Sequence, residues 1–109
     1  MFLKVPWWFP FGKVPEITPA ELRARLEQGD RLQIVDVRTE AEFARGHLPG
    51  AINLPIQRFR REISTLDLDR ERPVIVVCAT AHRSRPAVRL LRQQGYEAFQ
   101  LAGGMARWR

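Results

Sequence analysis

Short apolar runs alternate with amphipathic segments along most of the chain, and this pattern predicts its secondary structure. Four short runs rich in apolar and β-branched residues predict strands: residues 32–37, 51–54, 74–77 and 96–101. Four segments with apolar residues at helical spacing predict helices: residues 18–29, 39–46, 56–66 and 84–94. Because helices alternate with strands, the sequence predicts one α/β domain with a mainly parallel central sheet flanked by helices.

Local signals support several of these boundaries. The segments Thr18–Glu21 and Thr39–Glu42 each carry a threonine followed three residues later by a glutamate, the pattern of a helix capping box. Gly95 stands where the fourth helix should end. The run Val74–Val77 is apolar and β-branched throughout, which is typical of a strand covered on both faces.

Residues 1–15 differ from the rest and are predicted to be a separate proline- and aromatic-rich segment, with the domain spanning residues 16–109. Prolines at three positions of this segment prevent a helix. An exposed aromatic cluster is unfavourable in a monomer, so we expect the segment to fold back onto the domain or to mediate self-association. We expect docking to a membrane less than either of these. The residues concerned are Trp7, Trp8, Phe9 and Phe11.

Composition excludes several classes of protein. A chain of 109 residues with 45% hydrophobic residues is long enough for one core and does not favour disorder. Its one cysteine, Cys78, cannot form an internal disulfide, and with only His47 and His82 beside it no zinc site is expected. We expect no metal and no cofactor. The lone thiol and the lack of an apolar run of membrane-spanning length favour a cytoplasmic protein.

The formal net charge of +6 does not indicate a nucleic-acid-binding surface. The 18 basic residues are 16 arginines and two lysines, and they are spread along the chain. Arg23 and Arg25 alternate with Leu22 and Leu26, which is typical of the solvated face of an amphipathic helix. We therefore expect no nucleic-acid partner.

The cysteine stands at a chemically favourable place. Cys78 follows the most apolar predicted strand, and residues 79–83 separate it from the next helix. The carboxyl end of a parallel strand is where α/β sheets bind ligands, and loop N–H groups above a helix N-terminus attract anions and favour the thiolate form of a cysteine. We therefore predict Cys78 as a nucleophile. The alternative, a small hydrophobic residue that ends a buried strand, is a common role for free cysteine.

The loop itself is predicted to bind anions. Arg83 would add a fixed positive charge as an electrostatic stabiliser, His82 could add charge near neutral pH, and Ser84 is placed to cap the following helix. Arg85 and Arg89 lie just beyond. The predicted anion-binding set is Ala79, Thr80, Ala81, His82, Arg83 and Ser84.

Three blocks of sequence resemble the rhodanese-like single-domain sulfurtransferases, over residues 17–108. The first block contains Asp36-Val37-Arg38, Glu42-Phe43 and Gly46-His47-Leu48-Pro49-Gly50-Ala51; the second is the loop from Cys78 to Ser84; the third is Gly103-Gly104 with Trp108. The resemblance implies a rhodanese-like α/β domain. It also implies that a Cys78 persulfide carries sulfane sulfur from a donor, such as thiosulfate or another persulfide, to a thiol or cyanide acceptor.

Details of the loop qualify that implication. The spacing Cys-x4-Arg is one residue shorter than in related phosphatases and arsenate reductases, so it suits a sulfur atom better than a tetrahedral oxyanion. Family loops usually carry glycine where Ala81 stands, and a basic residue often follows the cysteine, where this chain has Ala79. These two alanines leave open the alternative of a sulfur-relay or binding module with low small-molecule turnover, working beside a sulfur-carrier protein.

The other polar residues of the first block are interpreted as structural. Asp36, Arg38 and Glu42 lie at a strand end and in the next helical turn, where an ion-pair lattice would hold the loop. His47 is interpreted as a hydrogen-bonded turn residue and Trp108 as a lid on the core.

Overall fold

The structure is a computed structural model that describes residues 13–108. The segment that holds Trp7, Trp8, Phe9 and Phe11 lies outside the described residues, so its predicted fold-back or self-association stays a prediction. The strands are β1 (Glu16–Ile17), β2 (Gln33–Asp36), β3 (Ile52–Asn53), β4 (Val74–Val77) and β5 (Ala98–Leu101). The helices are α1 (Pro19–Glu27), α2 (Glu40–Ala44), α3 (Ile56–Glu62), η1 (Ile63–Leu66), α4 (Ser84–Gln93) and η2 (Gly104–Arg107), of which η1 and η2 are 3-10 helices.

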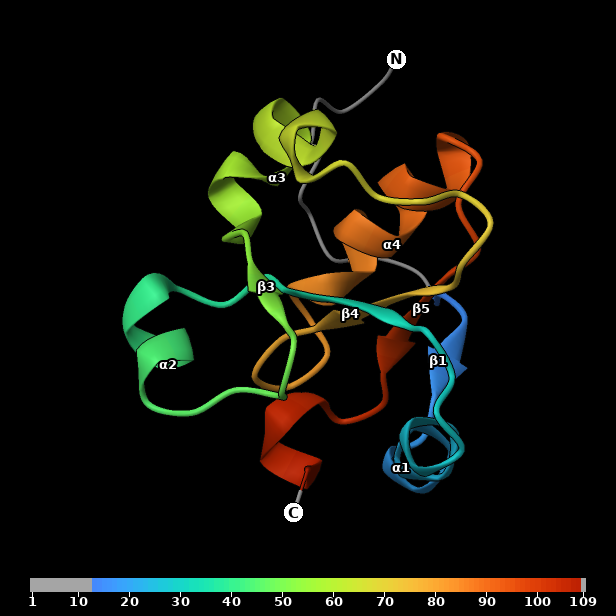
Figure 1. Cartoon of the computed structure of the whole chain (residues 1–109). Coiled ribbons are helices and arrows are strands. Elements are labelled where there is room, and N and C mark those ends of the chain that lie inside the picture. The colour runs from blue at the N-terminus through green and yellow to red at the C-terminus, as the bar shows by residue number, and fades with distance from the viewer. Residues whose placement is uncertain (1–12, 109) are drawn as a thin grey trace.

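All strand pairs are parallel, in the order β1-β5-β4-β2-β3. Helices α3 and α4 lie on one side of the sheet, and α1 and η2 lie on the other (Figure 1). The strand β4 is central and fully buried. Its side chains alternate, so that Val74 and Val76 join the core under α3 and α4, while Ile75 and Val77 join the core that contains Leu22 of α1. The predicted α/β fold is confirmed.

The structure differs from the sequence prediction in three places. The strand β1 was missed, because it has only two residues between Pro15 and the capping box of α1. The predicted helix 56–66 is an α-helix only to Glu62 and continues as η1. The strand predicted from residue 96 begins at Ala98, because the backbone of Tyr96 still closes the end of α4 by donating to Leu91.

Both predicted capping boxes are present. Thr18 accepts from the backbone of Glu21 and Thr39 from that of Glu42, and each glutamate accepts from the backbone of its threonine. Within residues 13–108, no helix has the length and hydrophobicity needed to cross a bilayer.

Candidate functional site

Cys78 lies at the carboxyl end of the central strand β4, and its residue surface is only 1% exposed. The loop that follows curls back over the sulfur, and the backbone N–H of Ala81 donates to Cys78 Sγ at 2.9 Å. A hydrogen bond of this kind stabilises negative charge on sulfur. The predicted nucleophile and the predicted loop therefore meet at the edge of the sheet.

Ala81 adopts a backbone conformation that is unusual for alanine. Its φ is +74°, in the left-handed region where a β-carbon collides with the neighbouring carbonyl. This turn directs the Ala81 N–H at the sulfur. The loop therefore forms without glycine at this position, and the chain bears a strain of roughly 1–2 kcal/mol there.

The prediction that Ser84 caps α4 is wrong. Arg83 occupies the N-cap position in helical conformation, and Ser84 is the first helical residue. Ser84 is fully buried and its hydroxyl points inward, where it donates to Gln100 Oε1 at 2.5 Å and lies 3.5 Å from Cys78 Sγ. A buried hydroxyl needs a partner inside the protein, and Gln100 of β5 supplies it.

Arg83 is held by a carboxylate. Its guanidinium donates two hydrogen bonds of 2.9 Å to the carboxylate oxygens of Glu42, at the N-terminus of α2. The guanidinium holds the pKa of Glu42 down at about 2, compared with 4.5 for an unperturbed glutamate. The pKa of Arg83 is raised, mainly by Glu42 and to a smaller degree by Cys78. The positive charge predicted for the loop is therefore balanced by Glu42, a side chain about one third exposed.

Asp36 and Arg38 form a separate buried pair next to the site. Arg38 donates through Nε and Nη2 to the Asp36 carboxylate, at distances of 2.8–3.1 Å. The pair raises the pKa of Arg38. Arg38 also donates to the Gly46 carbonyl, and the Asn53 amide donates to the carbonyls of Asp36 and Arg38. This lattice joins the ends of β2 and β3 to the turn after α2, whereas Glu42 pairs with the loop.

The remaining predicted residues lie at the surface or cover the core. Thr80 and His82 are exposed, and Ala79 is half-buried. His47 donates through Nδ1 to the Phe43 carbonyl at 2.8 Å, and its ring stacks on that of Phe43. Trp108 packs against the core on the α1 side.

Two contributors to the site were missed by sequence reasoning. Gln100 is 1% exposed in the middle of the apolar strand β5, and a lone polar residue in such a run is the signal that could have found it. The 3-10 helix η2 closes over the start of the loop: the N–H of Met105 donates to the Cys78 carbonyl at 2.7 Å, and that of Ala106 to the Ala79 carbonyl at 3.0 Å.

A protein-family model described as the rhodanese-like domain matches residues 18–109. The chain belongs to the rhodanese-like family. This finding confirms the predicted family, and with it the predicted fold.

Two relatives of this rhodanese-like domain match over almost their whole length. The putative sulfurtransferase YtwF of Bacillus subtilis (strain 168) is 30% identical over 96 residues, which are 88% of this chain and 91% of the relative. A sulfurtransferase of Allochromatium vinosum is 36% identical over 96 residues, which are 87% of this chain and 88% of the relative. The crystal structure of a rhodanese-like domain protein from Staphylococcus aureus has a TM-score of 0.79 at 32% identity, covering 88% of this chain and 92% of that one. The names of the two relatives support sulfur transfer in general.

The site of this rhodanese-like domain is suited to a reactive sulfur. Cys78 is enclosed, accepts a backbone N–H from Ala81 and lies at the N-terminal end of α4, whose first N–H groups carry partial positive charge. The neighbouring ion pair of Arg83 and Glu42 adds charge of both signs. The arrangement stabilises a small sulfur anion mainly through backbone groups.

Proposed function

We propose that the chain is a sulfurtransferase in which Cys78 carries sulfane sulfur as a persulfide. The observation that carries the proposal is the hydrogen bond from the Ala81 N–H to Cys78 Sγ, at the junction of β4 and α4. This donor and the helix N-terminus favour negative charge on sulfur, which both the attacking thiolate and the persulfide carry. The family membership of the chain supports the same chemistry.

The reaction consists of two displacements. First, the Cys78 thiolate attacks the outer sulfur of thiosulfate, an S–S bond forms, and the original S–S bond breaks as sulfite leaves with the electron pair. Then a thiolate or cyanide attacks the terminal sulfur of the persulfide and releases the Cys78 thiolate. The thiol proton leaves to solvent before the first step, and no external oxidant is needed. Ping-pong kinetics follow from this sequence.

The acceptor must come from outside the chain. Cys78 is its single cysteine, so the protein has no second thiol that could attack the persulfide. Small thiols or the thiol of a carrier protein would serve, and they remain reduced in the cytoplasm, which is the compartment we propose.

Mass spectrometry of the intact protein tests the proposal. After incubation with thiosulfate or with an organic persulfide, we expect the mass to increase by one sulfur atom, and the increase to disappear when dithiothreitol is added. Cys78→Ser is the control and should gain no sulfur. Folded wild-type protein that gains no sulfur from either donor would refute the proposal.

A second candidate is a relay module that receives sulfur from a protein and turns over small anions slowly. The pairing of Arg83 with Glu42 favours it, because the charge that would attract thiosulfate is already balanced. Ala79 also adds no positive charge beside the sulfur. The net electrostatic attraction of the site for thiosulfate, a dianion, is therefore weak.

Comparing donors distinguishes the two candidates. Persulfide formation on Cys78 is measured with thiosulfate and with a persulfide-loaded cysteine desulfurase at equal sulfur concentration. Faster loading from the protein supports the relay, and faster loading from thiosulfate supports the small-molecule enzyme. Glu42→Gln should increase the thiosulfate rate selectively if charge balance limits it.

A further inference from the structure

A chain of hydrogen bonds leads from the Cys78 sulfur through the interior to Glu16 on the edge strand β1. Cys78 Sγ lies 3.5 Å from Ser84 Oγ, Ser84 Oγ lies 2.5 Å from Gln100 Oε1, and Gln100 Nε2 lies 2.6 Å from Glu16 Oε2. Ser84 and Gln100 are 0% and 1% exposed, whereas Glu16 of β1 is exposed. The chain therefore joins the enclosed sulfur to a surface carboxylate.

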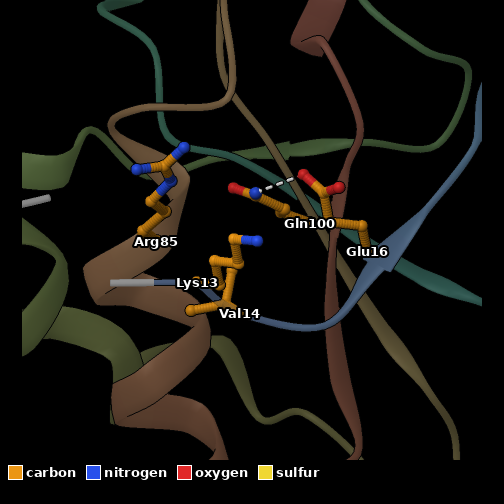
Figure 2. A pocket seen from close by; sticks show the side chains of 5 residues that line it. All are labelled: Lys13, Val14, Glu16, Arg85 and Gln100. Atoms are coloured by element: carbon orange, nitrogen blue, oxygen red, sulfur yellow. Dashed lines mark hydrogen bonds between the residues drawn. The ribbon is translucent and has the colours of Figure 1, made fainter. Parts of the chain in front are cut away.

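The Glu16 end of this chain opens into a cavity of about 220 Å³. Its lining comes from Lys13, Val14, Glu16, Arg85 and Gln100. Figure 2 shows the Gln100 amide directed at the Glu16 carboxylate, with Lys13 and Arg85 on the same side of the sheet. Glu16 is therefore in contact with the contents of this cavity, whose lining does not include the loop residues 79–83.

The chemistry of each member fixes the direction of the whole chain. An ionised carboxylate only accepts hydrogen bonds, so Glu16 requires the amide NH2 of Gln100 to face it. The Gln100 carbonyl then faces Ser84, and Ser84 must give its one hydroxyl hydrogen to that carbonyl. The Ser84 oxygen is left as an acceptor toward Cys78, which donates its S–H.

We propose that Glu16 is a positioning residue that acts through Gln100 and Ser84 to hold Cys78 in the S–H form. A thiolate or persulfide at Cys78 keeps the Ala81 donor but has no S–H to give to Ser84, so the Ser84 hydroxyl must turn toward the sulfur when the reactive form is produced. That turn costs the Ser84–Gln100 hydrogen bond unless the Gln100 amide also rotates, and rotation places its carbonyl against Glu16. The inference rests on the proposed function, because it concerns how the same nucleophile is activated.

Two substitutions at Glu16 test the proposal at an exposed position. Glu16→Gln removes the requirement that Gln100 donate, because an amide both donates and accepts, and Glu16→Lys supplies a donor that reverses the direction of the chain. We expect the rate of Cys78 alkylation by iodoacetamide at neutral pH to increase from wild type to Glu16→Gln to Glu16→Lys. The total increase should be about two- to tenfold, corresponding to one net hydrogen bond.

The infrared S–H stretch provides a readout that a purely structural role would not move. Because the chain has one cysteine, the band belongs to Cys78 alone. In the wild-type protein the band should lie at the lower frequency of a hydrogen-bonded S–H. In Glu16→Lys it should be weaker, because less of Cys78 is in the S–H form. An unchanged band together with an unchanged alkylation rate would overturn the proposal.

A double-mutant cycle separates the hydrogen-bond chain from direct electrostatics. In a Ser84→Ala background the chain is broken, so Glu16→Lys should no longer accelerate alkylation, whereas an effect of charge through space would persist there. An equal acceleration in both backgrounds refutes the proposal. Gln100→Met breaks the chain at another point and serves the same purpose if Ser84→Ala does not fold.

The test also separates this proposal from the proposed function, because alkylation and the S–H band require no sulfur donor. If wild-type protein gains no sulfur while Glu16→Lys accelerates alkylation, the positioning role stands and the proposed function fails. If persulfide forms normally while alkylation is insensitive to Glu16, the positioning role fails alone.

Discussion

The contact between Gly104 and the start of the loop after Cys78 gives the most quantitative prediction. Gly104 has φ of +63°, and a β-carbon at this position would lie 2.6 Å from the carbonyl carbon and oxygen of Ala79 and closer still to the Cys78 carbonyl oxygen. These are backbone atoms, so they cannot move aside without moving the loop. Gly104→Ala should therefore force η2 away from Cys78.

Gly29 provides a matched control for the effect of conformation. It has φ of +82°, and a β-carbon there would meet nothing within 4 Å. Alanine in the left-handed region costs roughly 1–2 kcal/mol at either position. Only Gly104→Ala adds steric overlap, which typically costs about 1–3 kcal/mol in a packed site. We expect Gly104→Ala to lower the free energy of unfolding by about 2–5 kcal/mol, and Gly29→Ala by about 1–2 kcal/mol.

The free energy of unfolding of both variants is measured by urea unfolding, monitored by circular dichroism. A second readout is the alkylation rate of Cys78, which should change in Gly104→Ala because the hydrogen bonds from Met105 and Ala106 hold the carbonyls of Cys78 and Ala79. Gly29→Ala should leave that rate as in the wild type. Equal losses of stability in the two variants would refute the reasoning, since they would mean that η2 does not press against the loop.

Three other predictions concern the loop and its ion pair. Ala81→Gly should change the free energy of unfolding by less than about 1 kcal/mol, because relief of the strained left-handed backbone offsets the greater freedom of glycine in the unfolded chain. The control Ala87→Gly, at a buried helical position, should lower the free energy of unfolding by about 1 kcal/mol or more. Equal losses of stability in urea unfolding would contradict this prediction. Folding lowers the pKa of Glu42 from 4.5 to about 2, so its pair with Arg83 stabilises the protein above pH 4.5 and loses this effect as the pH falls to 2. Between pH 4.5 and 2, the free energy of unfolding of Glu42→Gln should therefore depend less on pH than that of the wild type. Arg83→Ala should slow persulfide formation from thiosulfate by about tenfold and from a neutral donor much less, because it leaves the negative charge of Glu42 unbalanced near the sulfur. Equal slowing with both donors would assign Arg83 a structural role.

Much of the fold and the position of Cys78 could be predicted from the sequence because they depend on local signals. The β-branched run Val74–Val77 specifies a buried strand wherever it lies in a sheet, and the capping boxes at Thr18 and Thr39 specify where helices begin. Cys78 follows that strand directly, so its place at the sheet edge is a consequence of chain order. The left-handed turn falls at Ala81, the position where family loops usually carry glycine.

The partners of the site residues could not be predicted in this way. Arg83 pairs with Glu42, 41 positions away in the sequence, and the Ser84 hydroxyl donates to Gln100 and does not cap the helix N-terminus. A hydroxyl beside a helix start can cap it or point inward, and burial decides between the two. Burial of Ser84 depends on which strand lies beneath it.

Taken by itself, the sequence determined an α/β chain with a parallel sheet and one cysteine at a strand end, since periodicity, caps and chain order are properties of neighbouring residues. Only the tertiary structure decided that Glu16, 84 positions from Gln100, completes a hydrogen-bond chain to that cysteine. The physical reason is strand order: β5 lies between β1 and β4, so it brings Gln100 between Glu16 and the Cys78 sulfur.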